Sequence, residues 1–166
     1  MSKLTLKTEG DRHVVGTRRF NASPEAVYRA HIEPKLIQQW MLGPEGWSMP
    51  VCINDPRPGG KFRYEWTNEK RGGFHITGEF VELVPFSRIV HVERMHLPDP
   101  TPDNHVVTTF EKDGSGTLMT IAHDSAGRRV ARRNARDWDG ARHGSQLRPA
   151  GRLGLIFNSY PHRTKG

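Results

Sequence analysis

The most informative part of the chain reads NASPEAVYRAHIEPKLIQQW and occupies residues 21–40. Ser23 is a residue type that caps helix N-termini with its side-chain oxygen. Pro24 suits the first helical position, and Glu25 places a negative charge near the positive end of the helix dipole. These residues predict that a helix begins at Pro24. Its short apolar face consists of Val27, Tyr28 and His31.

A second helix follows the first almost at once. Pro34 interrupts the helical pattern, and a new short helix is predicted over Lys35 to Trp40. Before the pair, residues His13 to Phe20 (HVVGTRRF) are rich in β-branched and aromatic side chains and predict a strand. One strand followed by two short helices is a distinctive beginning for a domain.

From Trp47 onward the pattern is that of strands. Met49, Val51 and Ile53 alternate with other residues, so we expect them on one face of a strand that ends at the DPRPGG turn. KFRYEW (61–66) alternates strictly, which is typical of a half-buried antiparallel strand. One face of it carries Phe62, Tyr64 and Trp66.

Four more strands are predicted beyond this one. They have the sequences FHITGEFVEL (74–83), SRIVHVERM (87–95), HVVTTFEK (105–112) and TLMTIAH (117–123). Gly78 in the first of them indicates a bulge or a bend. Six strands in a meander after two short helices, with the strand before the helices as a seventh, predict an α+β fold with a six- to seven-stranded antiparallel sheet.

Composition and charge narrow the function. The net charge of +7 resides in residues 125–166, which carry +8, whereas residues 1–124 carry −1. A nucleic-acid-binding domain usually carries its basic surface on the folded body, so we do not expect a nucleic-acid partner. The chain has one cysteine, no apolar run long enough to cross a membrane and no secretory leader at its start. We therefore expect a cytoplasmic protein without a membrane partner.

Four successive segments resemble one family. They are RRFNASPEAVYRAHIEPKLIQQW (18–40), NDPRPGGKFRYEW (54–66), GEFVELVPFSRIVHVERM (78–95) and TTFEKDGSGTLMTIAH (108–123). In this order they resemble the single-domain proteins similar to the activator of heat-shock protein 90 ATPase, within the START-like, birch-pollen-allergen-like superfamily (SRPBCC). The resemblance covers about residues 13–123.

The resemblance implies a helix-grip fold, in which a curved antiparallel sheet wraps around a long C-terminal helix with an apolar cavity between them. Where this chain follows and departs from that fold, we expect four segments: an N-terminal arm at 1–12, a helix-grip body at 13–124, an atypical C-terminal helix region at 125–150, and a basic, flexible tail at 151–166. The family's closing helix reads approximately G-M-x-x-G-M-x-x-S-F-x-x-L, and this chain does not contain it.

With one choice of codons, the missing helix can be read in a shifted frame. DWDGARHGSQLRPAG (137–151) can be encoded so that a shift of one base reads TGMEHGMEASFDRLA, which is the expected closing helix. Trp138 has a single codon, and that codon yields the required glycine. We therefore predict that the residues after His123 include a frameshifted end, natural or introduced. A shortened, atypical helix over residues 128–142 then predicts a looser cavity, lower stability and a homodimer formed through the exposed sheet face.

The resemblance turns the apolar side chains of the body into candidate cavity residues. Core packing alone accounts for most of them, and the alternative is that they line a pocket for an apolar or aromatic small molecule. The candidates are Trp40, Trp47, Met49, Phe62, Tyr64, Trp66, Phe74, His91, Met95, Phe110, Met119 and Ile121.

Polar candidates are few. Tyr64, His91 and Arg57 are the groups that could orient a ligand, although Arg57 is better explained as an ion-pair partner of Asp55 in a turn. His75, His91 and His123 lie on separate strands and would suit zinc if they converged. Histidines scattered over strands are more often surface or singly hydrogen-bonded groups, so we expect no metal and no cofactor.

Three functions remain open. The first is a non-enzymatic protein that binds a hydrophobic small molecule in the cavity, and this is the function we expect. The second is a chaperone ATPase co-regulator, against which stands the absence of a further domain in a chain of this length. The third is an enzyme of the polyketide cyclase or aromatase type, for which only Tyr64, His91 and His123 offer acid–base groups. For the first function, non-enzymatic binding, we expect no catalytic residue.

Overall fold

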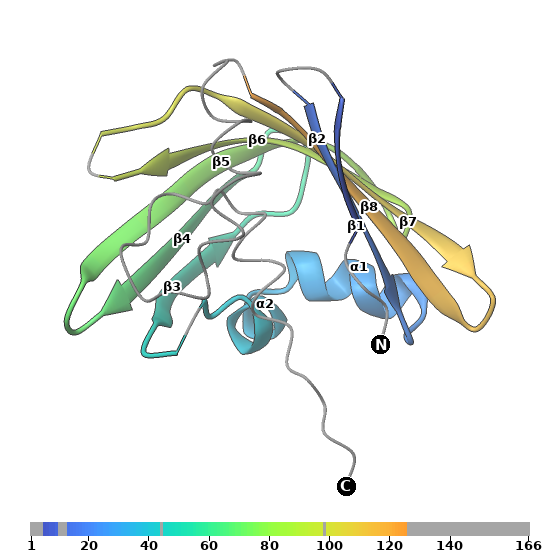
Figure 1. Cartoon of the computed structure of the whole chain (residues 1–166), viewed down its shortest axis with the longest axis horizontal. Helices are drawn as coiled ribbons and strands as arrows, with labels where there is room; N and C mark the ends of the chain where they lie inside the picture. The colour runs from blue at the N-terminus through green and yellow to red at the C-terminus, as the bar shows by residue number, and fades with distance from the viewer. Residues whose placement is uncertain (1–4, 10–12, 44, 98, 126–166) are drawn as a thin grey trace, which may run out of the picture.

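The computed structural model describes residues 5–9, 13–43, 45–97 and 99–125. These residues form one antiparallel sheet of eight strands in the order β1-β2-β8-β7-β6-β5-β4-β3, with two helices between β2 and β3. The sheet is strongly curved, and α1 and α2 lie under its concave side (Figure 1). The elements are β1 Thr5–Glu9, β2 His13–Phe20, α1 Pro24–Ile32, α2 Pro34–Trp40, β3 Ser48–Asn54, β4 Lys61–Asn68, β5 Gly72–Val84, β6 Arg88–His96, β7 Asn104–Asp113 and β8 Gly116–Ser125.

The two helices begin where the sequence predicts. The side chain of Ser23 accepts a hydrogen bond from the backbone N–H of Ala26 at 3.2 Å, and Pro24 is the first residue of α1. Glu33 has an extended backbone between the helices, because the residue before a proline disfavours the helical conformation. The indole N–H of Trp40 donates to the carbonyl of Ala30 at 2.8 Å and fixes α2 against α1.

The α+β class, the curved antiparallel sheet and the pair of short helices are confirmed. The sheet has eight strands, one more than the upper limit of the six to seven that the sequence predicts. Thr5–Glu9, within the predicted N-terminal arm, forms β1 and pairs antiparallel with β2. β2 in turn pairs with β8, so the second strand and the last strand of the described chain lie side by side.

The predicted alternation in β3 is wrong beyond its first part. Met49 is buried, but Ile53 is 60% exposed. The pairing of β3 with β4 shifts register just before Val51, at a point where Pro50 has no N–H to donate to the ladder. The extra residue inverts which side chains face the core, and a strict two-residue period cannot anticipate that inversion.

Gly78 does not mark a bulge. The irregularity in β5 lies between Phe80 and Glu82. At Gly78 a Cβ atom would lie 2.1 Å from Cζ of Phe62 and 2.4 Å from the carbonyl oxygen of Val92. The glycine therefore serves a close approach, in which the ring of Phe62 lies directly over the backbone of β5.

The predicted C-terminal helix region and basic tail lie outside the described residues, apart from Ser125 at the end of β8. Among the described residues, no helix has the length and hydropathy needed to cross a membrane.

Candidate functional site

The strand register determines which side chains face the helices. Residues directly opposite each other in antiparallel strands share a face of the sheet. Two transverse rows therefore cross the concave face, and each combines apolar and polar residues. The first row contains Asn54, Phe62, Gly78, Glu93 and Asn104, and the second contains Phe80, His91, Val106, His123 and Val14.

All twelve candidate cavity residues lie at this concave face or against it. Trp47 and Phe74 are partly buried and pack on the core. The other ten are buried, namely Trp40, Met49, Phe62, Tyr64, Trp66, His91, Met95, Phe110, Met119 and Ile121. The structure thus brings the predicted set together, and whether these residues bind a ligand stays a prediction.

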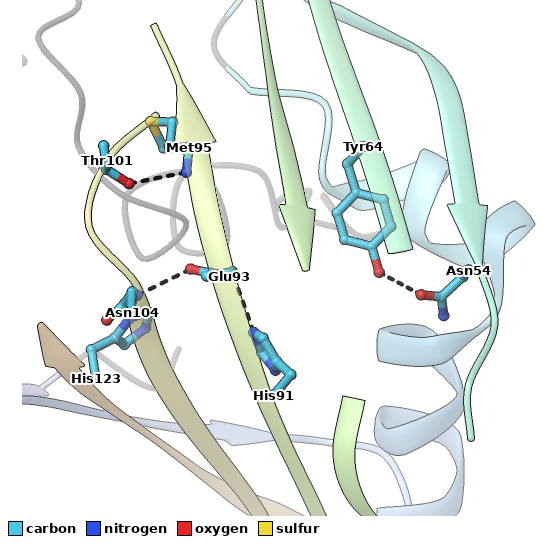
Figure 2. Close-up of polar contacts among 8 residues, drawn as sticks. All are labelled: Asn54, Tyr64, His91, Glu93, Met95, Thr101, Asn104 and His123. Carbon is cyan, nitrogen blue, oxygen red and sulfur yellow. Dashed lines mark hydrogen bonds and ion pairs between the residues drawn. The ribbon is translucent and has the colours of Figure 1, made fainter. Parts of the chain in front are cut away.

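A buried chain of polar side chains crosses three strands at this face (Figure 2). Nε2 of His91 lies 3.1 Å from Oε2 of Glu93 on the same strand. The amide nitrogen of Asn104, on β7, donates to Oε1 of Glu93 at 3.2 Å and to Nδ1 of His123, on β8, at 2.8 Å. His91, Glu93 and His123 are only 3%, 4% and 5% exposed. We call His91, Glu93, Asn104 and His123 the polar relay.

The donors and acceptors of the polar relay determine its protonation. An amide nitrogen only donates, so Nδ1 of His123 must carry a lone pair, and the proton of that neutral ring resides on Nε2. Glu93 receives the amide of Asn104 on one oxygen and the ring of His91 on the other, which suits an ionised carboxylate. The ring of His91 then donates its Nε2–H to Glu93.

A second polar contact lies on the side of β3 and β4. The hydroxyl of Tyr64 donates to Oδ1 of Asn54 at 2.9 Å, and the amide nitrogen of Asn54 donates to the carbonyl of Ile32 at the end of α1. Tyr64 has no exposed surface. Asn54 therefore orients the Tyr64 hydroxyl and joins the sheet to the helix pair.

Phe62 lies between the two polar contacts. Its ring stacks on Tyr64 with centroids 5.1 Å apart and meets the ring of His91 edge-on at 5.4 Å. Phe80 makes a further edge-on contact with His91 at 6.4 Å. The absence of a side chain at Gly78 gives the Phe62 ring this position. The polar groups of the face are thus embedded in a wall of aromatic rings.

The other polar candidates lie elsewhere. The side chain of Arg57 is 73% exposed and pairs with Asp55 at 2.8 Å, which favours its role in the turn. His75 stacks on His96, its cross-strand partner, with centroids 4.2 Å apart, and both lie on the opposite face of the sheet from His91. Burial, and then the positive charge of Arg63, lower the pKa of His75.

The three histidines named for zinc do not converge. His75 faces away from His91 and His123, because successive residues of a strand alternate between faces. Within the ranges that the structure describes, no group of three or more His, Cys, Asp or Glu side chains is arranged to hold a metal ion.

Sequence reasoning missed Glu93 and Asn104. The signal for Glu93 was present: Ile89, His91, Glu93 and Met95 are spaced by two and are all buried. A glutamate in register with apolar residues of a strand indicates a buried carboxylate that needs partners. Asn104 had no comparable signal, because it is the first residue of β7 and follows a loop.

Comparison with known proteins agrees with this fold. Three solved structures superpose over most of the chain, although their sequence identities are low. A protein of Rhodobacter sphaeroides has a TM-score of 0.74 at 23% identity, covering 95% of each chain. Protein Ms6760 of Mycobacterium smegmatis has a TM-score of 0.70 at 18% sequence identity, and the match covers 94% of this chain and 96% of that protein. Protein CV1439 of Chromobacterium violaceum has a TM-score of 0.64 at 24% sequence identity, and the match covers 90% of this chain and 98% of that protein.

No curated protein sequence matches the chain. A family model does, and it is described as activator of Hsp90 ATPase homolog 1-like protein. The match spans residues 21–147, which is most of the chain, and includes both helices and strands β3 to β8. It also reaches into the region predicted to be frameshifted. The chain therefore belongs to the family of activator of Hsp90 ATPase homolog 1-like proteins.

Proposed function

We propose that this protein binds an apolar or aromatic small molecule on the concave side of its sheet, against the aromatic wall and beside the polar relay. The observation that carries the proposal is the combination of apolar and polar side chains at one face. Ligand sites are lined mainly by hydrophobic and aromatic residues, with a small number of placed polar groups that orient the ligand.

Core packing alone gives a poorer account of this face. Burying a polar group costs free energy unless it is hydrogen-bonded, and burying an ionised one costs more. The sheet nevertheless buries Glu93 and two histidines where apolar side chains would pack at lower cost. Recognition of a polar group on an otherwise apolar ligand supplies a reason for keeping them.

The test compares two probes that differ by one hydroxyl group, 2-naphthol and naphthalene. We expect saturable quenching of tryptophan fluorescence by both, because Trp40, Trp47 and Trp66 lie in or against the core. We expect 2-naphthol to bind more tightly, because its hydroxyl can hydrogen-bond to Tyr64 or to the polar relay. Quenching that rises linearly with probe concentration and does not saturate would refute the proposal.

Two variants locate the binding site. Tyr64→Phe removes only a hydroxyl, and His91→Gln replaces a ring of the polar relay. Each variant should therefore reduce the difference in affinity between 2-naphthol and naphthalene. Arg57→Gln is the matched control, because that side chain is exposed and lies in a turn. An equal effect of all three variants would show that the probes bind elsewhere.

The name of the family model favours a second function, that of a chaperone ATPase co-regulator. Retention of heat-shock protein 90 on the immobilised protein, together with a change in its ATPase rate, would support this function. The third function is a cyclase or aromatase activity. It would be supported by turnover of a poly-β-keto substrate that is lost in Tyr64→Phe or His91→Ala.

We also propose a cytoplasmic location, which cell fractionation tests.

Residues 125–150 carry a separate proposal, that they are encoded out of frame. The gene sequence between codons 120 and 160 decides it directly, since codons incompatible with TGMEHGMEASFDRLA in the shifted frame refute it. If the codons agree, both frames should be expressed. We then expect the shifted product to be the more stable one and to bind 2-naphthol with a defined stoichiometry.

A further inference from the structure

We propose that His91, oriented by Glu93, is a general base that removes a proton from carbon in a flat, apolar ligand. The class of substrate is a carbon acid, a molecule whose C–H bond is acidified by an adjacent carbonyl or C=N group. The inference rests on the proposed function, because the substrate must first bind at the concave face.

The contact between His91 and Glu93 prepares the ring for this role. With Glu93 ionised and the His91 ring neutral, Nε2 carries the ring proton and donates it to the carboxylate 3.1 Å away, and the lone pair of the ring lies on Nδ1. When Nδ1 takes up a proton, the imidazolium that forms lies 3.1 Å from a carboxylate and is stabilised by it. A carboxylate that fixes the tautomer and supports the charged ring is the arrangement that makes histidine an effective base.

The remaining members of the relay hold the carboxylate in place. Asn104 donates one N–H to Glu93 and the other to His123, so β6, β7 and β8 are tied together through one amide. Glu93 consequently has a donor on each oxygen and cannot rotate away from His91 without breaking a hydrogen bond. Glu93 and Asn104 are positioning residues in this scheme, and His91 is the catalytic residue.

The surroundings of His91 suit proton abstraction from carbon. The ring is 3% exposed and has Phe62 and Phe80 edge-on against it. Exclusion of water strengthens the interaction between the imidazolium and the carboxylate. Aromatic neighbours would hold a flat substrate by stacking and edge-on contacts.

The step balances without a co-reactant. In a carbonyl substrate, the proton moves from the α-carbon to Nδ1 of His91, and the electron pair of the C–H bond moves onto the carbonyl oxygen as an enolate. Return of the proton to another position of the enolate isomerises the substrate. His91 is regenerated in its starting form, and Glu93 exchanges no proton.

The probe for this chemistry is 5-nitrobenzisoxazole, a flat aromatic molecule that reacts in one step with a base. The base takes the C3 proton, the C–H electron pair completes a C≡N bond, and the N–O bond breaks. The electrons of that bond leave on the oxygen of the coloured product, 2-cyano-4-nitrophenolate. Its absorbance measures the rate without any knowledge of the natural ligand.

With the full chain we expect a saturable rate about 100-fold or more above that of free imidazole at equal concentration, the lower range for a positioned general base. His91→Gln should remove this excess. Glu93→Gln should lower kcat and change the dependence of the rate on pH, because a neutral amide cannot stabilise the imidazolium. His75→Gln, on the opposite face, should leave the rate unchanged.

Two results would overturn the inference. One is a rate of the unaltered protein no higher than that of free imidazole, a comparison that needs no variant. The other is a His91→Gln protein that is folded by circular dichroism, binds 2-naphthol and retains the full rate. Binding of 2-naphthol without the excess rate defeats only this inference, whereas the absence of saturable binding defeats the proposed function as well.

Discussion

Replacing Gly78 by alanine is a one-carbon change that tests the packing of the concave face. The added Cβ would lie 2.4 Å from the backbone oxygen of Val92, about 1 Å inside the 3.4 Å at which ordinary contact begins. It would also lie 2.1 Å and 2.5 Å from two atoms of the Phe62 ring. The ring can move, but the carbonyl belongs to the neighbouring strand, so β5 and β6 must separate locally.

Overpacking of this kind costs about 3 kcal/mol, near the upper end of its usual range, because a backbone atom is involved. In urea the midpoint of unfolding should then fall by about 1.5 M for a slope of about 2 kcal/mol per molar. The melting temperature should fall by about 9 °C. Circular dichroism during urea titration measures the first, and calorimetry measures the second.

The control is Gly72→Ala. A Cβ at Gly72 has no atom within 4 Å, but the residue has a φ of +77°, so that variant carries backbone strain of about 1 kcal/mol without a clash. Prior replacement of Phe62 by leucine should lower the cost of Gly78→Ala by about 1 kcal/mol, because the clashing ring atoms are then gone. If Gly78→Ala proves no more destabilising than Gly72→Ala, the reasoning about close approach is wrong.

Three further predictions concern the helix cap and the titrating groups of the surface. Ser23→Ala should lower the free energy of unfolding by about 1 kcal/mol in urea titration, because the cap of α1 is lost. By NMR, His75 should titrate below the ordinary histidine range, and Arg63→Gln should reverse only part of this shift, because burial is the larger cause. Since the folded state binds that proton less readily, His75 should reduce stability as the pH falls through that range. The hydrogen bond from Arg94 should hold the pKa of Asp103 below its usual value, and in Arg94→Gln this pKa should return toward the usual value. The contribution of Asp103 to the stability of the fold should be lost as the pH falls through the lowered pKa.

The sequence predicts most of the architecture because local signals agree with the global fold. Ser23 and Pro24 mark the start of α1, and the alternation in residues 61–66 marks the buried face of β4. The failure in β3 has a physical cause, since the shift of register beside Pro50 depends on pairing with another strand. β1 was missed because residues 5–9 carry a weak pattern and form a strand only by pairing with β2.

The candidate site divides in the same way. The apolar strand residues of the concave face follow from alternation, and the resemblance to the family joined them with Trp40 and Trp47 into one candidate set. The polar relay was not, because the contacts of Asn104 with Glu93 and with His123 join residues on different strands. Such contacts depend on the register of three strands at once, and a register is a property of pairs of strands rather than of any one segment.

The irregularity in β3 bears on how this protein behaves at high concentration. β3 is the last strand of the described sheet on its side, and the outer edge of such a strand offers backbone donors and acceptors to any other chain. The change of register beside Pro50 makes this strand depart from a regular ladder. The irregularity that a strict alternation does not predict therefore makes this edge, with its exposed Ile53, a poorer template for a strand of another chain.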